Sequence, residues 1–126
     1  MTPAPTPSFF IERLDRSHRL EAFDCGNPPL NDWLSRYAWT NHQADSARTY
    51  VAVESGRVAG YYALTTGSVL KHESPSRVAK GLANHPVGVV VLARLAVGQS
   101  FHGVGLGKAS LFDALSRVAT WTGPQG

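Results

Sequence analysis

The most informative stretch of this sequence reads Leu95-Ala96-Val97-Gly98-Gln99-Ser100-Phe101-His102-Gly103-Val104-Gly105-Leu106-Gly107-Lys108. The apolar residues 87–97 predict a strand, and the apolar spacing beyond Gly107 predicts an amphipathic helix. Between them glycine alternates with other residues, so backbone N–H groups can approach an anion without interference from a Cβ atom. A helix N-terminus adds about half a positive charge. The stretch therefore predicts a phosphate-binding turn between a strand and a helix.

Two common phosphate motifs do not fit this turn. A Walker A loop that ends at Gly107 and Lys108 requires glycine at position 102 and serine or threonine at 109, where the chain has His102 and Ala109. A dinucleotide-binding fingerprint that starts at Gly103 requires glycine at 108, where the chain has Lys108. What remains is a strand, a short link and H-G-x-G-x-G at the start of a helix.

The rest of the chain alternates strand and helix signals. Residues 9–14 predict a first strand, and residues 49–54 and 58–64 predict an antiparallel hairpin whose second strand continues to Leu70. Asn27 caps a predicted helix with apolar residues at positions 30, 33, 34, 37 and 38. Residues 71–86 predict a loop or a segment that carries a short helix, and the strand at 87–97 is expected to be central and buried on both faces. This order predicts an α+β fold with helices against a sheet.

Composition limits the class of protein. The chain has 126 residues, 43% hydrophobic and 17% charged, which predicts one globular domain. No apolar run is long enough for a membrane span and residues 1–8 lack signal-peptide features, so we expect a cytoplasmic protein with no membrane partner. Cys25 is the only cysteine, and no metal-ligand spacing occurs, so we expect no disulfide and no metal. The net charge of +3 favours an anionic partner.

The run Arg94-Leu95-Ala96-Val97 followed, after four residues, by His102-Gly103-Val104-Gly105-Leu106-Gly107 resembles the acetyl-CoA motif of the GNAT acetyltransferase superfamily. Phe23-Asp24-Cys25-Gly26, Leu30-Asn31-Asp32-Trp33-Leu34 and residues 58–64 are similar to the GNAT toxins of toxin–antitoxin pairs. The resemblance covers residues 9–119, after a disordered lead-in at 1–8, and leaves a non-matching tail at 120–126. It implies a mixed, mainly antiparallel GNAT-like sheet flanked by helices.

The resemblance implies specific roles for this segment. Backbone groups of Leu95, Ala96 and Val97 would hold the pantetheine arm of acetyl-CoA. The N–H groups of the turn would hold the pyrophosphate; its residues are His102, Gly103, Val104, Gly105, Leu106, Gly107 and Lys108. The activity implied is transfer of acetyl to the amino group of an aminoacyl-tRNA, with a ribbon-helix-helix antitoxin as partner. A homodimer is left open, as is the amino acid on the tRNA.

The chain departs from the family pattern in two places. His102 stands where the family has glutamine or arginine, so an ionic contact to phosphate there would depend on pH. The family continues past the second helix with a strand, a helix carrying a catalytic tyrosine and a final hairpin, which residues 120–126 do not match. The catalytic acid is therefore unknown. The alternative is an inactive truncated remnant that only binds CoA, nucleic acid or antitoxin.

Several other side chains have both a structural and a functional interpretation. Arg94 is the one charge in an apolar strand, which indicates either structural pairing or a substrate groove. Trp33, Tyr37 and Trp39 are expected in the core rather than under stacked bases. Basic residues elsewhere could form a tRNA surface or be ordinary solvated charges; these are Arg36, Arg48, Arg77 and Lys80.

Overall fold

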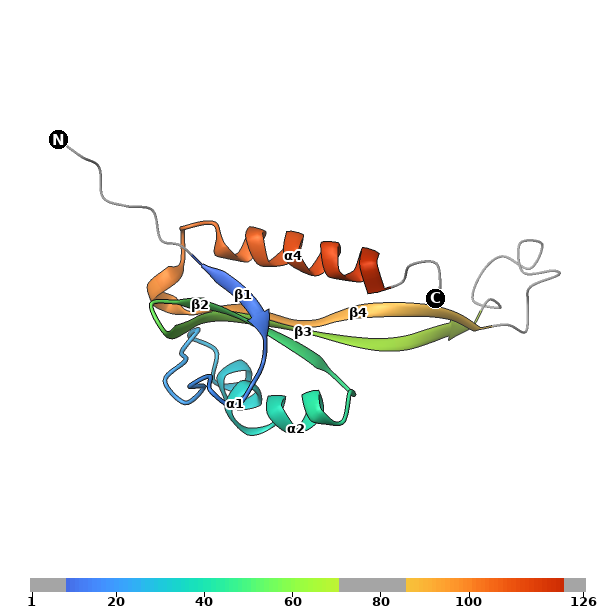
Figure 1. The fold of residues 1–126 in the computed structure, drawn as a ribbon, viewed down its shortest axis with the longest axis horizontal. Coiled ribbons are helices and arrows are strands. Elements are labelled where there is room, and N and C mark those ends of the chain that lie inside the picture. The colour runs from blue at the N-terminus through green and yellow to red at the C-terminus, as the bar shows by residue number, and fades with distance from the viewer. Residues whose placement is uncertain (1–8, 71–85, 122–126) are drawn as a thin grey trace.

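The computed structural model describes residues 9–70 and 86–121. The elements are β1 (Phe10–Arg13), α1 (Pro28–Arg36), α2 (Ala38–Gln43), β2 (Arg48–Glu54), β3 (Arg57–Leu70), β4 (Pro86–Val97), the 3₁₀ turn η2 (Gln99–Phe101) and α4 (Leu106–Trp121). The strands form an antiparallel sheet in the order β1-β2-β3-β4. Helices α1 and α2 cover one face of it and α4 the other (Figure 1). The predicted α+β class with flanking helices is confirmed.

The helix predicted after Asn27 forms as two shorter helices. The Asn27 side chain accepts a hydrogen bond from the Leu30 N–H, and the two prolines occupy the first turn, as expected. At Tyr37 φ changes to −120°, and α2 starts at Ala38. This break turns Ala38 into the core and leaves Tyr37 52% exposed, so the prediction that Tyr37 packs in the core is wrong.

The predicted hairpin joins β2 and β3 through Ser55 and Gly56, which both have positive φ, at 52° and 79°. Two central residues with positive φ match the twist of the flanking strands, which explains the glycine. Strand β3 is the buried centre of the sheet. Tyr61 packs with Leu34 on the α1 side, and Tyr62 packs with Ala114 on the α4 side.

Strand β4 is less buried than predicted. Val91 and Leu92 are 45% and 39% exposed, and among the described strands β4 pairs only with β3. The expectation of burial on both faces is therefore wrong for these residues, because β3 occupies the central position.

The apolar face predicted for the last helix is also rotated. Helix α4 buries Leu106, Ser110 and Ala114, which share one face at i, i+4 and i+8, whereas Leu111 and Leu115 are exposed.

No helix within the described ranges is both long and apolar enough to cross a bilayer. Some predictions concern residues outside those ranges. They are the lead-in at 1–8, the loop at 71–85 with Arg77 and Lys80, and the last residues, 122–126.

Candidate functional site

The turn between β4 and α4 is fixed by backbone hydrogen bonds at its start. The Gly98 N–H donates to Ala59 O at 2.7 Å, and the Gln99 N–H donates to Asp24 O at 2.8 Å. The Phe101 N–H then donates to Gly98 O at 2.9 Å within η2. The entry to the turn is therefore tied both to β3 and to the loop before α1.

The N–H groups that follow are available to a ligand. Within the described structure, those of residues 103–108 donate to no protein acceptor, and the first helical bond runs from the Ala109 N–H to Gly105 O at 3.0 Å. Gly103 and Gly105 have φ of +82° and +84°, and a Cβ atom added to either would meet nothing within 4 Å. These two glycines give the turn its shape and leave it open. Gly107 lies inside α4, where a Cβ atom would only contact Val97, at 3.7 Å.

The edge of β4 that faces away from β3 presents further backbone groups. Gly98 and Ala59 form a hydrogen-bonded pair, and such pairs alternate along antiparallel strands. The peptide groups of Ala96 therefore bond to β3, whereas those of Leu95 and Val97 point to the other edge. Of the three residues predicted to hold a pantetheine arm, Leu95 and Val97 are placed to do so through backbone groups and Ala96 is not.

His102 contacts this same edge. Its Nε2 lies 2.8 Å from Val97 O, and because a carbonyl oxygen only accepts, we assign the ring proton to Nε2. The exposed ring thus covers an edge carbonyl next to the turn. Lys108 is exposed in the first turn of α4.

Arg94 lies on the opposite face of β4 from α4. Its guanidinium stands over the Trp33 ring, 4.5 Å from the centroid, and Trp33 is stacked on Tyr61 at 5.9 Å. Burial raises the pKa of Tyr61 to about 12, against the opposing effect of Arg94. The Tyr61 hydroxyl donates to Leu30 O at 2.8 Å. The strand is bulged at Ala93, directly before Arg94, where the pairing with β3 shifts by one residue.

The other predicted basic residues are not gathered at the turn. Arg36 is exposed in the last turn of α1. Arg48 lies at the start of β2, opposite Leu64 and away from the hairpin end, where its Nε donates to Asp45 Oδ1 at 2.8 Å. This hydrogen bond raises the pKa of Arg48 further above its usual range.

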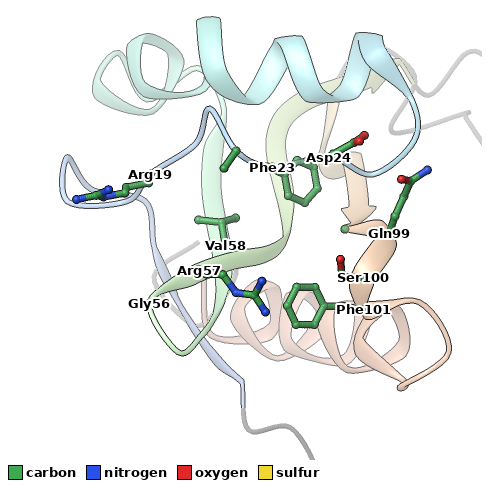
Figure 2. Close-up of a pocket in the computed structure, with 11 residues that line it drawn as sticks. Arg19, Phe23, Asp24, Gly56, Arg57, Val58, Gln99, Ser100 and Phe101 are labelled. Atoms are coloured by element: carbon green, nitrogen blue, oxygen red, sulfur yellow. The ribbon is translucent and has the colours of Figure 1, made fainter.

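Sequence reasoning missed a hollow of about 270 Å³ behind the turn, between the β2–β3 hairpin and η2. Figure 2 shows Arg57 reaching toward Phe101, and its guanidinium lies 5.3 Å from that ring centroid. Phe23 and Val58 form an apolar floor. Arg19 extends away from the hollow toward solvent (Figure 2). The residues come from three separate segments, so no local motif could have indicated the hollow.

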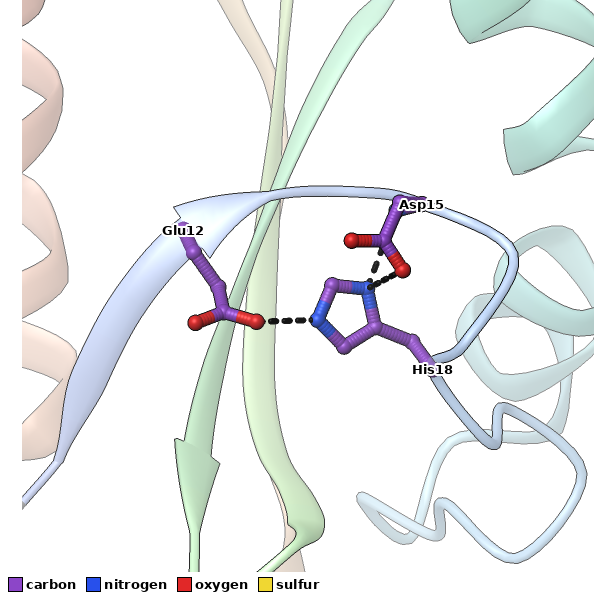
Figure 3. Close-up of side chains that lie close together, drawn as sticks. All are labelled: Glu12, Asp15 and His18. Atoms are coloured by element: carbon purple, nitrogen blue, oxygen red, sulfur yellow. Dashed lines mark hydrogen bonds and ion pairs between the residues drawn. The ribbon is translucent and has the colours of Figure 1, made fainter.

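A second cluster lies on the loop after β1. His18 Nε2 is 2.6 Å from Glu12 Oε2, and the Asp15 N–H donates to His18 Nδ1 at 3.0 Å (Figure 3). Both ring nitrogens already have partners on opposite sides of the ring. The three side chains are therefore held by hydrogen bonds and ion-pair contacts to one another. The cluster closes the loop that follows β1.

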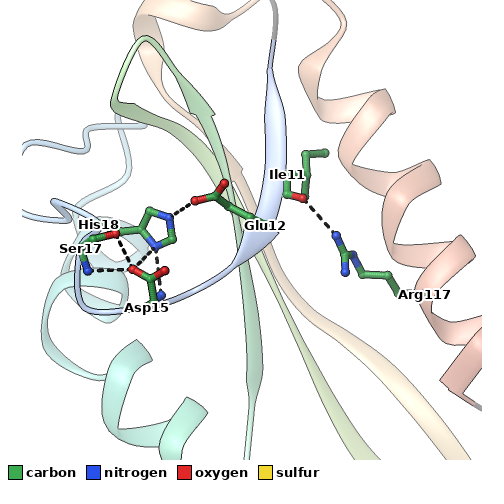
Figure 4. Close-up of polar contacts among 6 residues, drawn as sticks. All are labelled: Ile11, Glu12, Asp15, Ser17, His18 and Arg117. Atoms are coloured by element: carbon green, nitrogen blue, oxygen red, sulfur yellow. Dashed lines mark hydrogen bonds and ion pairs between the residues drawn. The ribbon is translucent and has the colours of Figure 1, made fainter.

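Polar contacts also anchor α4, whose first residues complete the turn. Asp113 Oδ2 accepts hydrogen bonds from the Tyr62 hydroxyl at 2.6 Å and from Arg117 Nε at 2.7 Å. Arg117 also donates to Ile11 O at 3.1 Å (Figure 4) and stands over the Tyr50 ring, 4.3 Å from the centroid. Burial, and next the Asp113 contact, raise the pKa of Tyr62. These contacts fix α4 to β1 and β3.

An antiparallel sheet that ends in an open run of N–H groups at a helix start can bind an anion such as a phosphate, as the glycine motif predicts. The chain matches the acetyltransferase (GNAT) family over residues 11–123 and belongs to that family. The predicted resemblance is therefore confirmed.

Relatives and solved structures agree with this assignment. A "tRNA-acetylating toxin" of Mycobacterium tuberculosis is 39% identical over 105 residues, 83% of this chain and 63% of that protein's length. AtaT complexed with acetyl-methionyl-tRNAfMet is 27% identical with a TM-score of 0.75, and the match covers 88% of this chain and 69% of that one. A mutant AtaT toxin bound to the C-terminus of the antitoxin AtaR and acetyl-CoA is 27% identical, with a TM-score of 0.73 and 88% and 65% coverage.

Proposed function

We propose that this chain binds acetyl-CoA and carries out N-acetyl transfer. The observation that carries the proposal is the run of N–H groups at residues 103–108, which have no acceptor in the described structure and lie at the positive end of α4. They would hold the pyrophosphate. The edge of β4 at Leu95 and Val97, where the His102 ring contacts the Val97 carbonyl, would hold the amides of the pantetheine arm.

The reaction needs few groups from the protein. The acceptor amine attacks the thioester carbonyl, a C–N bond forms, the C–S bond breaks, and the amine proton leaves with the thiolate. A backbone N–H of the β4 edge near Val97 would polarise the carbonyl as charge develops on its oxygen. Binding both substrates along one strand would supply the orientation. No side chain is assigned as general acid.

We propose an aminoacyl-tRNA as the acceptor. Support comes from the relative named as a tRNA-acetylating toxin and from the match to AtaT in complex with acetyl-methionyl-tRNAfMet. The net charge of +3, with nine arginines among twelve basic residues, suits a polyanion. Charged tRNA would place the reaction in the cytoplasm. An antitoxin, of the ribbon-helix-helix class, is proposed as partner by analogy with the AtaR complex, and a homodimer is a further proposal.

Calorimetric titration with acetyl-CoA tests the cofactor site. Gly105→Glu places a side chain and a negative charge among the open N–H groups. Charge-assisted hydrogen bonds contribute about 1.5–3 kcal/mol each, so losing one or more should weaken binding by at least about 10-fold. Gly56→Glu is the matched control, since Gly56 also has positive φ and open space around it but lies in the hairpin turn.

Transfer of labelled acetyl to charged tRNA tests the activity. Transfer that is lost in Gly105→Glu and kept in Gly56→Glu supports the proposal. Binding of acetyl-CoA without any transfer would instead support the alternative of a chain that only binds. Unchanged acetyl-CoA affinity in Gly105→Glu would refute the cofactor site itself.

A further inference from the structure

Arg94 differs from the three other arginines that stand over aromatic rings. Arg117 pairs with Asp113, Arg57 lies 3.6 Å from Glu54, and Arg16 is exposed to solvent. Arg94 is half-buried, yet within residues 9–70 and 86–121 it has no ion pair and no hydrogen bond. Removing a charge from water without a counter-charge is costly. Its guanidinium donors are therefore available to an anion.

The position of Arg94 relates it to the proposed reaction centre. It precedes Leu95 on β4, so it lies three residues, or about 10 Å of strand, from Val97. Its side chain lies on the α1 side of the sheet, whereas α4 and the turn that starts it lie on the other side. An anion on Arg94 would therefore be close to the reacting carbonyl but separate from the phosphates on the turn.

We propose that Arg94, oriented by Trp33, binds a backbone phosphate near the 3′ end of the acceptor RNA. The inference rests on the proposed function, because it takes the aminoacyl-tRNA as acceptor. The planar guanidinium matches the geometry of a phosphate with two parallel N–H bonds. Contact with the Trp33 ring limits the positions open to the guanidinium, which lowers the entropy lost when the phosphate binds.

The test measures two ligands separately on the full chain. Binding of an uncharged RNA minihelix ending in CCA is followed at several salt concentrations, and acetyl-CoA is titrated by calorimetry. Arg94→Gln should weaken minihelix binding about 10-fold and lower the salt slope by about one, the expected result for one lost phosphate contact. Acetyl-CoA affinity should stay within about 2-fold. Arg16→Gln is the matched control, because Arg16 also stands over a tryptophan, Trp39, at 5.8 Å.

Arg94→Lys keeps the charge without the paired donors, so it should lose part of the affinity while keeping the salt slope. This variant also covers the case in which Arg94→Gln fails to fold. The inference would be overturned if minihelix binding is unchanged in both Arg94→Gln and Arg94→Lys. It would also be overturned if Arg16→Gln weakens minihelix binding as much as Arg94→Gln does. A loss of acetyl-CoA affinity in Arg94→Gln would overturn it too, because that loss would place Arg94 on the cofactor. Wild-type protein that binds acetyl-CoA but no minihelix would refute both this inference and the proposed acceptor, and leave the cofactor site standing.

Discussion

Asp113→Ala should destabilise the protein more than any change to its exposed ion pairs. The substitution leaves the Tyr62 hydroxyl, on a side chain only 1% exposed, without its acceptor at 2.6 Å, which costs about 1–3 kcal/mol. It also removes the 2.7 Å contact with Arg117. The Asp113 and Arg117 side chains are 26% and 32% exposed, so solvent screening keeps that second contribution at the low end, about 1 kcal/mol. The expected loss in the free energy of unfolding is about 3 kcal/mol.

Urea denaturation of a double-mutant cycle separates these contributions. Tyr62→Phe alone should cost about 1 kcal/mol, because Asp113 keeps Arg117 as a partner. Asp113→Ala should cost less in that background, which gives a coupling energy of about 1–2 kcal/mol. Glu54→Ala is the control; its partner Arg57 lies 3.6 Å away on a side chain that is 67% exposed, so the change should cost about 0.5 kcal/mol or less. Additive effects of the two substitutions would refute the reasoning that Asp113 satisfies the buried hydroxyl.

Three further results are expected. Burial, and next the charge of Arg13, lower the pKa of His42, so the unfolded chain binds the proton more tightly than the folded protein. The free energy of unfolding should therefore be constant above about pH 7 and fall as the pH drops below the unfolded pKa of about 6.5. The urea midpoints measured at pH 7.5 and pH 5 should lie closer together in His42→Gln than in the wild-type protein. The affinity of the wild-type protein for the minihelix should decrease steeply with salt. At one fixed salt concentration, Arg36→Gln should lose more of this affinity than Trp39→Ala; a flat salt response with the larger loss in Trp39→Ala would contradict this order. His102→Ala frees an edge carbonyl from its ring contact and should raise acetyl-CoA affinity about 3-fold by calorimetry, whereas a loss would show that the ring itself contacts the ligand.

Most of the fold could be predicted because its signals are local. The cap at Asn27, the turn at Ser55 and Gly56, and the alternate glycines before α4 each specify a backbone conformation within a few residues. The helix break at Tyr37 was missed because the apolar spacing continues through it. The spacing of apolar residues does not show that the backbone angle φ changes at a single residue within the pattern.

The parts of the site that sequence could not predict depend on contacts between distant segments. Trp33 lies 61 positions before Arg94 in the chain, so the ring under the guanidinium becomes apparent only once α1 packs on the sheet. The same holds for the hollow beside Phe101. Which of the predicted strand residues offers backbone groups to a ligand depends on the pairing of β3 with β4. The hydrogen bond from the Gly98 N–H to Ala59 O shows which residues of β4 bond to β3 and which point to the open edge.

Four consecutive residues of β4 thus face three directions. The side chains of Arg94 and Ala96 lie toward α1, those of Leu95 and Val97 lie toward α4, and the peptide groups of Leu95 and Val97 lie along the open edge. The alternation of a strand makes this arrangement sensitive to register. A shift of one residue would move the Arg94 charge onto the α4 side and turn the Ala96 peptide groups to the edge. The extra residue at Ala93 separates this register from the one in which residues 86–92 pair with β3, so the arrangement of residues 94–97 does not depend on the register of the rest of the strand.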